Sequence, residues 1–194
     1  FAIEEKLKAN IVSKGYSTPT PIQDRTIPHI LRGIDVVGVA NTGTGKTAAF
    51  LIPLINVAML KKQEKVLIMV PTRELAGQIA DELAGFSKGL GIYSAVCVGG
   101  ASIGFQMSQL RRRPQFVIGT PGRLKDLLER KALILSDFRS VVLDEADRML
   151  DMGFIADMRR ILSLLPSPRH TLVFSATLSP EIEKLIGEFL REPV

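Results

Sequence analysis

Short apolar runs alternate with amphipathic segments along the whole 194-residue chain, and this alternation restricts its fold more than any other feature. The runs are rich in valine and isoleucine and are bounded by Gly, Pro or Asp, which is typical of strands buried on both faces. Strands separated by helices of this length predict βαβ crossovers and a parallel sheet. The predicted strands cover residues 35–40, 66–70, 93–98, 116–119, 141–143 and 171–174.

Helix-like segments lie between these runs. In the first, Ile3, Leu7 and Ile11 share one face because they are four residues apart, and the segment ends at Gly15. We find no repeat, low-complexity tract or internal linker, so the sequence predicts one α/β domain over residues 1–194, with a mostly parallel sheet covered by helices on both faces. The other predicted helices cover residues 48–60, 74–85, 103–111, 123–130, 155–164 and 181–190.

The composition excludes several classes of protein. With 46% apolar and 23% charged residues the chain can bury a core, which excludes wholesale disorder. Its one cysteine, Cys97, cannot form an internal disulfide, and its apolar neighbours favour a small buried side chain over a reactive thiol. The two histidines, His29 and His170, are far apart in sequence, so we expect no Cys/His metal cage.

Targeting signals are also missing from the sequence. No stretch is typical of a membrane span, and no signal-like n-region precedes the first helix. We therefore expect a cytoplasmic protein, or more broadly an intracellular one. Because the chain starts at Phe1 rather than at Met, we also expect it to be a piece of a longer protein.

The net charge of +5 is unevenly distributed along the chain. Residues 111–131 carry seven basic and two acidic side chains, an excess equal to that of the whole chain. Such a local excess indicates an anionic partner, although a solvated helix face is the simpler alternative. The basic residues are Arg111, Arg112, Arg113, Arg123, Lys125, Arg130 and Lys131, against Asp126 and Glu129.

A glycine-rich segment follows the first predicted strand and precedes an apolar helix. Gly43 and Gly45 allow the backbone to curl so that successive N–H groups point at phosphate oxygens. Lys46 would then reach the β- and γ-phosphates, and Thr47 would place its hydroxyl on Mg²⁺. A Gly/Thr-rich turn with a solvated lysine is the alternative, but the strand before and the helix after favour a phosphate loop. It reads Ala40-Asn41-Thr42-Gly43-Thr44-Gly45-Lys46-Thr47.

A second chemical signal follows the predicted strand 141–143. There Asp144 and Glu145 are adjacent, and carboxylates that end a buried strand are costly unless cations or water satisfy them. Asp144 is placed to hold Mg²⁺, and Glu145 to orient or deprotonate an attacking water. An acidic helix N-terminus is the alternative, and it explains Asp147 equally well.

These motifs, with others in the same order, resemble the first RecA-like domain of the DEAD-box RNA helicases over nearly the whole chain. Each motif alone is weak evidence, but seven in the family's order are strong evidence. The segments are 15–23, similar to the Q motif; 40–47, the phosphate loop; 71–76, 99–100 and 120–123, similar to RNA-contact motifs; 144–147, Asp-Glu-Ala-Asp; and 175–177, Ser-Ala-Thr.

The resemblance implies ATP and Mg²⁺ as ligands, with Lys46, Asp144 and Glu145 as catalytic residues and Thr47 and Asp144 at the metal. Gln23 would read the adenine edge, because its amide both donates and accepts, whereas guanine presents the reverse pattern. An upstream aromatic would stack on adenine, and Phe1 is the candidate, with core packing as the alternative. The implied nucleotide contacts are Phe1, Tyr16, Gln23, Asn41, Thr42, Gly43, Thr44, Gly45, Lys46 and Thr47.

The resemblance also implies RNA contacts and a coupling element. Glycines permit close approach to a sugar-phosphate chain, a helix N-terminus suits a phosphate, and arginine adds fixed positive charge. Contacts to the backbone and 2′-OH groups would make RNA binding independent of sequence. The implied RNA contacts are Thr72, Arg73, Gly99, Gly100, Thr120 and Arg123, and the coupling residues are Asp147, Ser175 and Thr177, for which a plain Ser/Thr turn is the alternative.

The expected function is therefore that of an ATP-dependent RNA helicase core. The family's second RecA-like domain, which carries arginine fingers and the other half of the RNA cleft, is absent from this chain. Loss of an arginine finger lowers the rate of phosphoryl transfer by roughly 10³–10⁵, so we expect this chain alone to bind adenine nucleotide weakly and barely hydrolyse it.

One alternative is another phosphate-loop enzyme, such as a DNA translocase or a nucleotide kinase, against which Gln23 and Ala146-Asp147 argue. The other is an ATP-dependent RNA clamp, scaffold or RNP remodeller.

Overall fold

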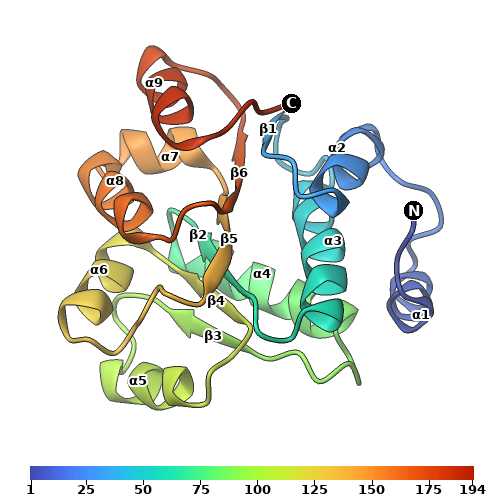
Figure 1. The fold of residues 1–194 in the computed structure, drawn as a ribbon, viewed down its shortest axis with the longest axis horizontal. Coiled ribbons are helices and arrows are strands. Elements are labelled where there is room, and N and C mark those ends of the chain that lie inside the picture. The colour runs from blue at the N-terminus through green and yellow to red at the C-terminus, as the bar shows by residue number, and fades with distance from the viewer.

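Six strands form one sheet in the order β1-β6-β5-β2-β4-β3 in the computed structural model, which describes all residues 1–194 (Figure 1). Every pair of neighbouring strands is parallel, so the predicted parallel α/β sheet is confirmed. All six predicted strands are present, and the largest shift of a boundary is at β5, which begins three residues earlier than predicted. The strands are β1 (Val36–Val39), β2 (Lys65–Met69), β3 (Ser94–Cys97), β4 (Phe116–Gly119), β5 (Phe138–Leu143) and β6 (His170–Ser175).

Helices cover both faces of the sheet, as predicted (Figure 1). Those in the first part of the chain pack on one face, and those in the second part pack on the other. The first group is α1 (Glu5–Ser13), α2 (Pro21–Leu31), α3 (Lys46–Leu60) and α4 (Arg73–Phe86). The second group is α5 (Ile103–Arg111), α6 (Pro121–Glu129), α7 (Ala146–Asp151), α8 (Ile155–Leu164) and α9 (Pro180–Phe189).

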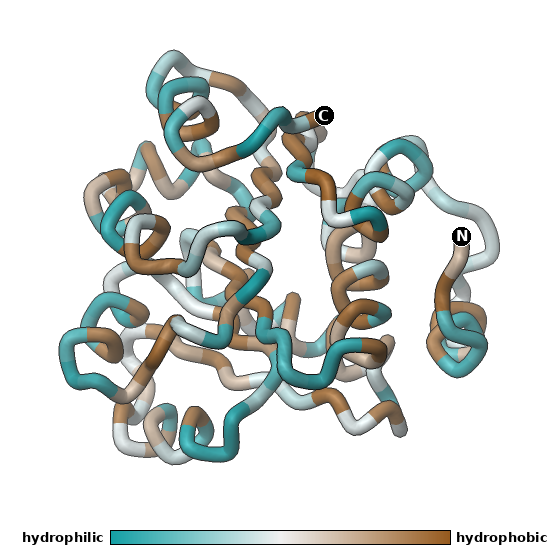
Figure 2. The backbone as a smooth tube through the Cα atoms, in the orientation of Figure 1, coloured by the Kyte–Doolittle hydropathy of each residue, from teal (hydrophilic) through white to brown (hydrophobic).

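Two hydrophobic cores lie on the two faces of the sheet. Side chains alternate along a strand, so Val66 and Ile68 of β2 enter one core while Leu67 and Met69 enter the other. Each core holds 23 buried residues, which is why the strands are apolar at every position rather than at alternate ones. In Figure 2 the central strands are accordingly mostly brown, while brown and teal alternate along the outer helices.

Two helices were not predicted from the sequence. α2 begins at Pro21, where proline costs no hydrogen bond, and Gln23 Oε1 accepts from the Thr20 N–H at 3.0 Å to cap this helix. It continues through Pro28 because its buried face packs on α3. α7 has only six residues, too few for a periodic apolar pattern. In both segments tertiary packing outweighs weak local signals.

Two residues with reactive side chains are structural here. Cys97 is fully buried, and burial raises the pKa of its thiol to about 12, so it stays protonated at neutral pH. His170 Nε2 contacts the Ile34 carbonyl oxygen at 2.8 Å, and burial lowers the pKa of this imidazole. No helix combines the length and the apolar character that crossing a membrane would require.

Asp35 fastens the last residues of the chain to the edge strand β1. Its buried carboxylate accepts from the backbone N–H groups of Thr171 and Arg191, each at 2.8 Å. The backbone of Val194 pairs with Asp35 and Val37 on either side of this point. Asp35 therefore holds residues 191–194 against β1.

Candidate functional site

The residues singled out after the predicted strands all lie at one edge of the sheet, because the carboxyl ends of parallel strands share an edge. The strand order divides them into two groups. The phosphate loop, the acidic cluster and the Ser-Ala-Thr segment follow β1, β5 and β6, which are neighbours. Thr72, Gly99 and Thr120 follow β2, β3 and β4, which form the other half of the sheet.

The loop between β1 and α3 is built as the glycine pattern predicts. Gly45 has a φ of +92°, and a Cβ there would lie 2.5 Å from Gln23 Nε2, so only glycine fits. Lys46 is the first residue of α3 and is 6% exposed, and its Nζ donates to the Ala40 carbonyl at 2.9 Å. Thr44 Oγ1 donates to the Asn41 carbonyl at 2.7 Å. Carbonyl oxygens of the loop itself thus accept from both side chains.

Asp144 and Glu145 directly follow β5 and line the same cavity as this loop. Asp144 is 3% exposed, and burial raises the pKa of its carboxyl to about 6, although Lys46 and the Glu145 N–H act to lower it. Glu145 has a φ of +51°, a strained backbone for a residue with a side chain, and its carboxylate pairs with Arg148 at 3.2 Å. A buried carboxylate that ionises with difficulty next to a buried lysine is typical of a site that binds cationic or polar groups.

A cavity of about 600 Å³ joins the loop and the acidic pair. Lys46, Thr47, Asp144 and Glu145 line it, so residues about 100 positions apart in sequence face the same space. Thr42 and Gly43 line the cavity as well. Sequence reasoning did not assign to this site the α4 side chains that also line the cavity. These are Leu75, the half-buried Glu82, and the exposed Gln78 and Asp81; of the four only Leu75 lies in a motif, the segment 71–76.

An apolar cavity of about 260 Å³ adjoins this space, and Tyr16 lines both. Tyr16 packs edge-on against Phe86 with ring centroids 5.3 Å apart, and burial, followed by the nearby Glu82, raises the pKa of its hydroxyl. Phe1 also lines the apolar cavity but is 48% exposed, so it does not pack in a core, the alternative considered above. The aromatic pair Phe1 and Tyr16 thus borders one small hydrophobic space.

Gln23 lines the same apolar cavity but is 3% exposed. Its Oε1 accepts from the Thr20 N–H, and its Nε2 donates to the Gly45 carbonyl at 3.1 Å. One N–H and one lone pair of the amide remain without a partner. The side chain therefore joins the start of α2 to the phosphate loop, a structural role that the sequence pattern did not predict.

On the other half of the edge, Thr72 Oγ1 accepts from the Leu75 N–H at 3.2 Å and caps α4. Arg73, the first residue of α4, is exposed and extends over Gly100. Gly100 has a φ of +77°, and a Cβ there would lie 2.6 Å from Arg73 Nη1. Gly99 next to it is exposed. This part of the surface presents one guanidinium beside an uncovered stretch of backbone.

Arg123 is held by a buried amide that sequence reasoning missed. Its Nη1 donates to Gln106 Oε1 at 3.0 Å and to the Ala101 carbonyl at 3.1 Å. Gln106 is 2% exposed and donates in turn to the Val98 carbonyl at 2.9 Å. These bonds join the loop after β3 to the start of α6. Thr120 is the N-cap residue of α6, and its side chain makes no capping hydrogen bond.

The segment after β6 contacts the acidic cluster, as predicted. Thr177 donates to Asp147 Oδ2 through both its hydroxyl, at 3.0 Å, and its backbone N–H, at 3.1 Å. Ser175 Oγ accepts from the Asp147 backbone N–H at 3.2 Å. Burial acts to raise the pKa of Asp147, but its interactions with Thr177, Ser175 and the Arg148 backbone N–H together outweigh it, and the pKa is lowered. The carboxylate thus links α7 to the end of β6.

Comparison with known proteins agrees with this geometry. The sequence profile of the DEAD/DEAH box helicases matches residues 20–185, most of the chain. The chain belongs to this family. The motifs that carried the resemblance all lie within or next to this match, and in the folded domain those that follow strands meet at one edge of the sheet.

Relatives and solved structures give the same result for this DEAD-box domain. It is 45% identical over 181 residues to a protein named ATP-dependent RNA helicase DeaD from Buchnera aphidicola, covering 92% of this chain and 30% of that protein. A hypothetical ATP-dependent RNA helicase from Sulfolobus tokodaii superimposes with a TM-score of 0.91 at 38% identity, covering 99% of this chain and 56% of that one. A DEAD box protein from the hyperthermophile Methanococcus jannaschii superimposes with a TM-score of 0.94 at 36% sequence identity. This match covers 100% of this chain and 53% of that one. The chain therefore spans between about a third and just over half of these relatives.

Proposed function

We propose that this chain is the nucleotide-binding RecA-like domain of an ATP-dependent RNA helicase, which works when joined to a second RecA-like domain. The observation that carries the proposal is the 600 Å³ cavity in which Lys46 and Thr47 face Asp144 and Glu145. Groups for binding phosphates and groups for activating water are brought to one space there, which is what phosphoryl transfer to water requires.

ATP fits the two adjoining cavities. The triphosphate would occupy the larger, polar one at the start of α3, where the helix dipole and backbone N–H groups favour anions. Adenine would occupy the apolar one between Phe1 and Tyr16. The remaining N–H and lone pair of Gln23 can bind the adenine edge, which presents an acceptor and a donor.

Mg²⁺ also fits the residues present. No group of three or more His, Cys, Asp or Glu side chains is arranged to hold a metal ion. Mg²⁺ does not require one, because it is usually bound through one or two carboxylates together with substrate phosphates and water. Asp144 and the Thr47 hydroxyl would hold it, and the bound ion would neutralise charge that develops on the phosphates.

The protein groups would act as follows. Lys46 exchanges its contact with the Ala40 carbonyl for phosphate oxygens. Glu145 accepts a hydrogen bond from the attacking water and orients it towards the γ-phosphate. Because Asp147 joins α7 to Thr177, a change at the acidic cluster is transmitted to the segment after β6.

RNA would bind on the other half of the sheet edge. Arg73 and Arg123 supply positive charge, and Gly99 and Gly100 allow the sugar-phosphate backbone to approach. These contacts go to the sugar-phosphate backbone rather than to base edges, which favours binding that is independent of sequence.

Replacement of Glu145 by Gln in the full-length protein tests the proposal. RNA-stimulated ATP turnover should fall roughly 10²–10⁴-fold, while binding of a fluorescent ATP analogue should change little. Glu183→Gln, an exposed position on α9, is the matched control and should retain turnover. Unchanged turnover in Glu145→Gln would remove this residue from its assigned role.

Strand displacement by the wild type separates unwinding from the alternative of an ATP-dependent RNA clamp. An intact enzyme that hydrolyses ATP but displaces no RNA strand would contradict the helicase assignment. The 194-residue chain by itself should bind the ATP analogue weakly and show almost no RNA-stimulated turnover. Turnover near that of the intact protein would refute the need for groups from a second domain.

A further inference from the structure

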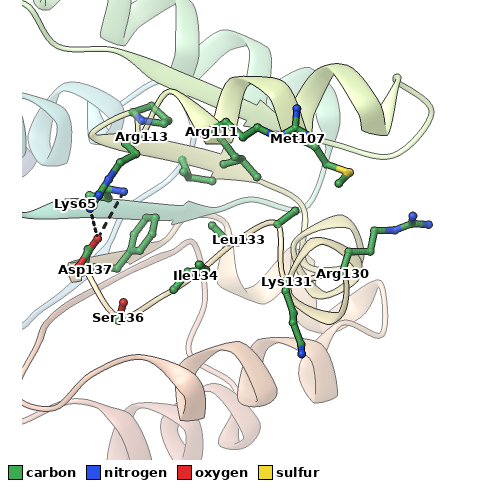
Figure 3. A pocket seen from close by; sticks show the side chains of 15 residues that line it. Lys65, Met107, Arg111, Arg113, Arg130, Lys131, Leu133, Ile134, Ser136 and Asp137 are labelled. Carbon is green, nitrogen blue, oxygen red and sulfur yellow. Dashed lines mark hydrogen bonds and ion pairs between the residues drawn. The ribbon is translucent and has the colours of Figure 1, made fainter.

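A third cavity, of about 500 Å³, lies at the opposite edge of the sheet from the nucleotide and RNA motifs (Figure 3). Lys65 and Phe138, which line it, are the first residues of β2 and β5, so it opens at the amino ends of these strands. α5 ends beside it at Arg111, and the residues just after α6, Arg130 and Lys131, also line it. Nothing in the proposed ATPase cycle uses this space.

The cavity carries a large excess of positive charge. Five cationic side chains line it, against the single carboxylate of Asp137. Lys65 and Arg113 share that carboxylate at 3.9 and 2.8 Å, and Figure 3 shows them converging on it. The other three cations are Arg111, Arg130 and Lys131.

Two of these cations have no partner within the chain. Arg130 pairs with Asp126 at 2.9 Å, but neither Arg111 nor Lys131 forms an ion pair, and both are exposed. Much of the local charge excess found in the sequence is therefore gathered around one hollow. Cations at a helix C-terminus also stabilise the helix dipole, which accounts for Arg111 at the end of α5 and for Arg130 and Lys131 at the end of α6. It does not account for Lys65, at the start of β2.

One wall of the cavity is apolar and exposed. Ile134 is 66% exposed, an unusual position for a large aliphatic side chain, and the buried Leu133 lies next to it (Figure 3). Met107 lines the cavity from α5. A hollow that combines an apolar wall with a cationic rim complements an occupant that is apolar in the middle and negatively charged around it.

The geometry does not suit a nucleic acid or a free phosphate. The helices α5 and α6 end here, so they offer none of the free N–H groups that surround a phosphate at a helix N-terminus. Phe138, the one aromatic residue in the lining, is 2% exposed and lies under Lys65, so no ring is available for a base to stack on.

We propose that this cavity binds an acidic peptide segment of a partner protein, which inserts a leucine- or phenylalanine-sized side chain against Ile134 and pairs its flanking carboxylates with Arg111 and Lys131. Such a site would attach the domain to another protein on the side away from the catalytic edge. Both could then be occupied together.

The experiment uses the 194-residue chain and a short fluorescent peptide in which glutamates flank a central Leu-Phe pair, with binding measured by anisotropy. The variants Arg111→Glu and Ile134→Glu change exposed positions, so the fold should survive, which circular dichroism checks. Each should weaken binding by about tenfold or more. Lys184→Glu on α9, outside the cavity, reverses a charge in the same way as Arg111→Glu and should change the affinity by less than about twofold.

Several results would overturn the proposal. These are absence of peptide binding by the wild type, an equal loss in Lys184→Glu, or equal binding of a peptide with glutamine in place of glutamate. Displacement of the peptide by inorganic pyrophosphate or by single-stranded RNA would also overturn it, since it would identify a phosphate site instead. ATP and Mg²⁺ should not compete, because their proposed site is at the other edge of the sheet.

Discussion

Replacement of Asp144 by Asn should make the ligand-free domain more stable at neutral pH, although the residue is essential to the proposed function. Asp144 is 3% exposed, and burial raises the pKa of its carboxyl from a usual 3.8 to about 6. Ionising this carboxyl at pH 7 therefore costs the folded protein free energy that the unfolded chain does not pay.

The sign and size of the effect follow from proton linkage. Between about pH 4 and pH 6 the folded state binds more protons at this residue than the unfolded state does, so the free energy of unfolding decreases as the pH rises through this range. A difference of roughly two pH units corresponds to about 3 kcal/mol. Asparagine cannot ionise, so the variant should gain about this much over the wild type between about pH 4 and pH 7.

Urea denaturation of both proteins across this pH range measures the change. In thermal melts, the difference in melting temperature between variant and wild type should increase by about 6–12 °C in favour of the variant from about pH 4 to pH 7. Asp151→Asn, an exposed position at the end of α7 without an ion pair, is the matched control and should show no such trend. The stability gain of Asp144→Asn over the wild type should grow as the pH rises. A gain in the free energy of unfolding that is independent of pH, or that shrinks as the pH rises, would refute the reasoning.

Three further substitutions test the architecture of the site, each by urea denaturation. Asp35→Ala should cost about 2–4 kcal/mol because it leaves two backbone N–H groups without their acceptor, and a loss below about 1 kcal/mol would contradict that role. Gly45→Ala should lower the free energy of unfolding by about 2–4 kcal/mol, because its φ is positive and a Cβ there would meet Gln23. Gly77→Ala, in an open position of α4, should be neutral or stabilising by up to about 1 kcal/mol. Equal effects of the two substitutions would rule out the strain argument. Gln106→Leu should cost about 1–3 kcal/mol and weaken RNA binding because Arg123 loses its buried acceptor, and unchanged RNA affinity would separate this amide from the interface.

The strands and the motif residues were predictable because their signals are local. A run of branched apolar residues is recognisable wherever it lies, and a glycine with positive φ such as Gly45 is required by the turn that it makes. Helix α2 was not predicted because two prolines weaken its pattern and its stability comes from packing on α3. Gln106 was missed for a related reason: a buried glutamine is functional only through Arg123, which is 17 residues away in sequence.

The sequence by itself determined which residues could do chemistry and that most of them follow strands, since both properties depend on neighbouring residues. It also determined that these residues share one edge, because parallel strands all end on the same side of a sheet. Only the tertiary structure decided the order β1-β6-β5-β2-β4-β3, which depends on which apolar faces pack together across long crossovers. That order puts the phosphate loop, Asp144 and Thr177 in one half and Arg73 and Arg123 in the other. It places β5, which Asp144 follows, directly beside β2, which leads to Arg73, so the two halves of the edge meet at this pair of strands.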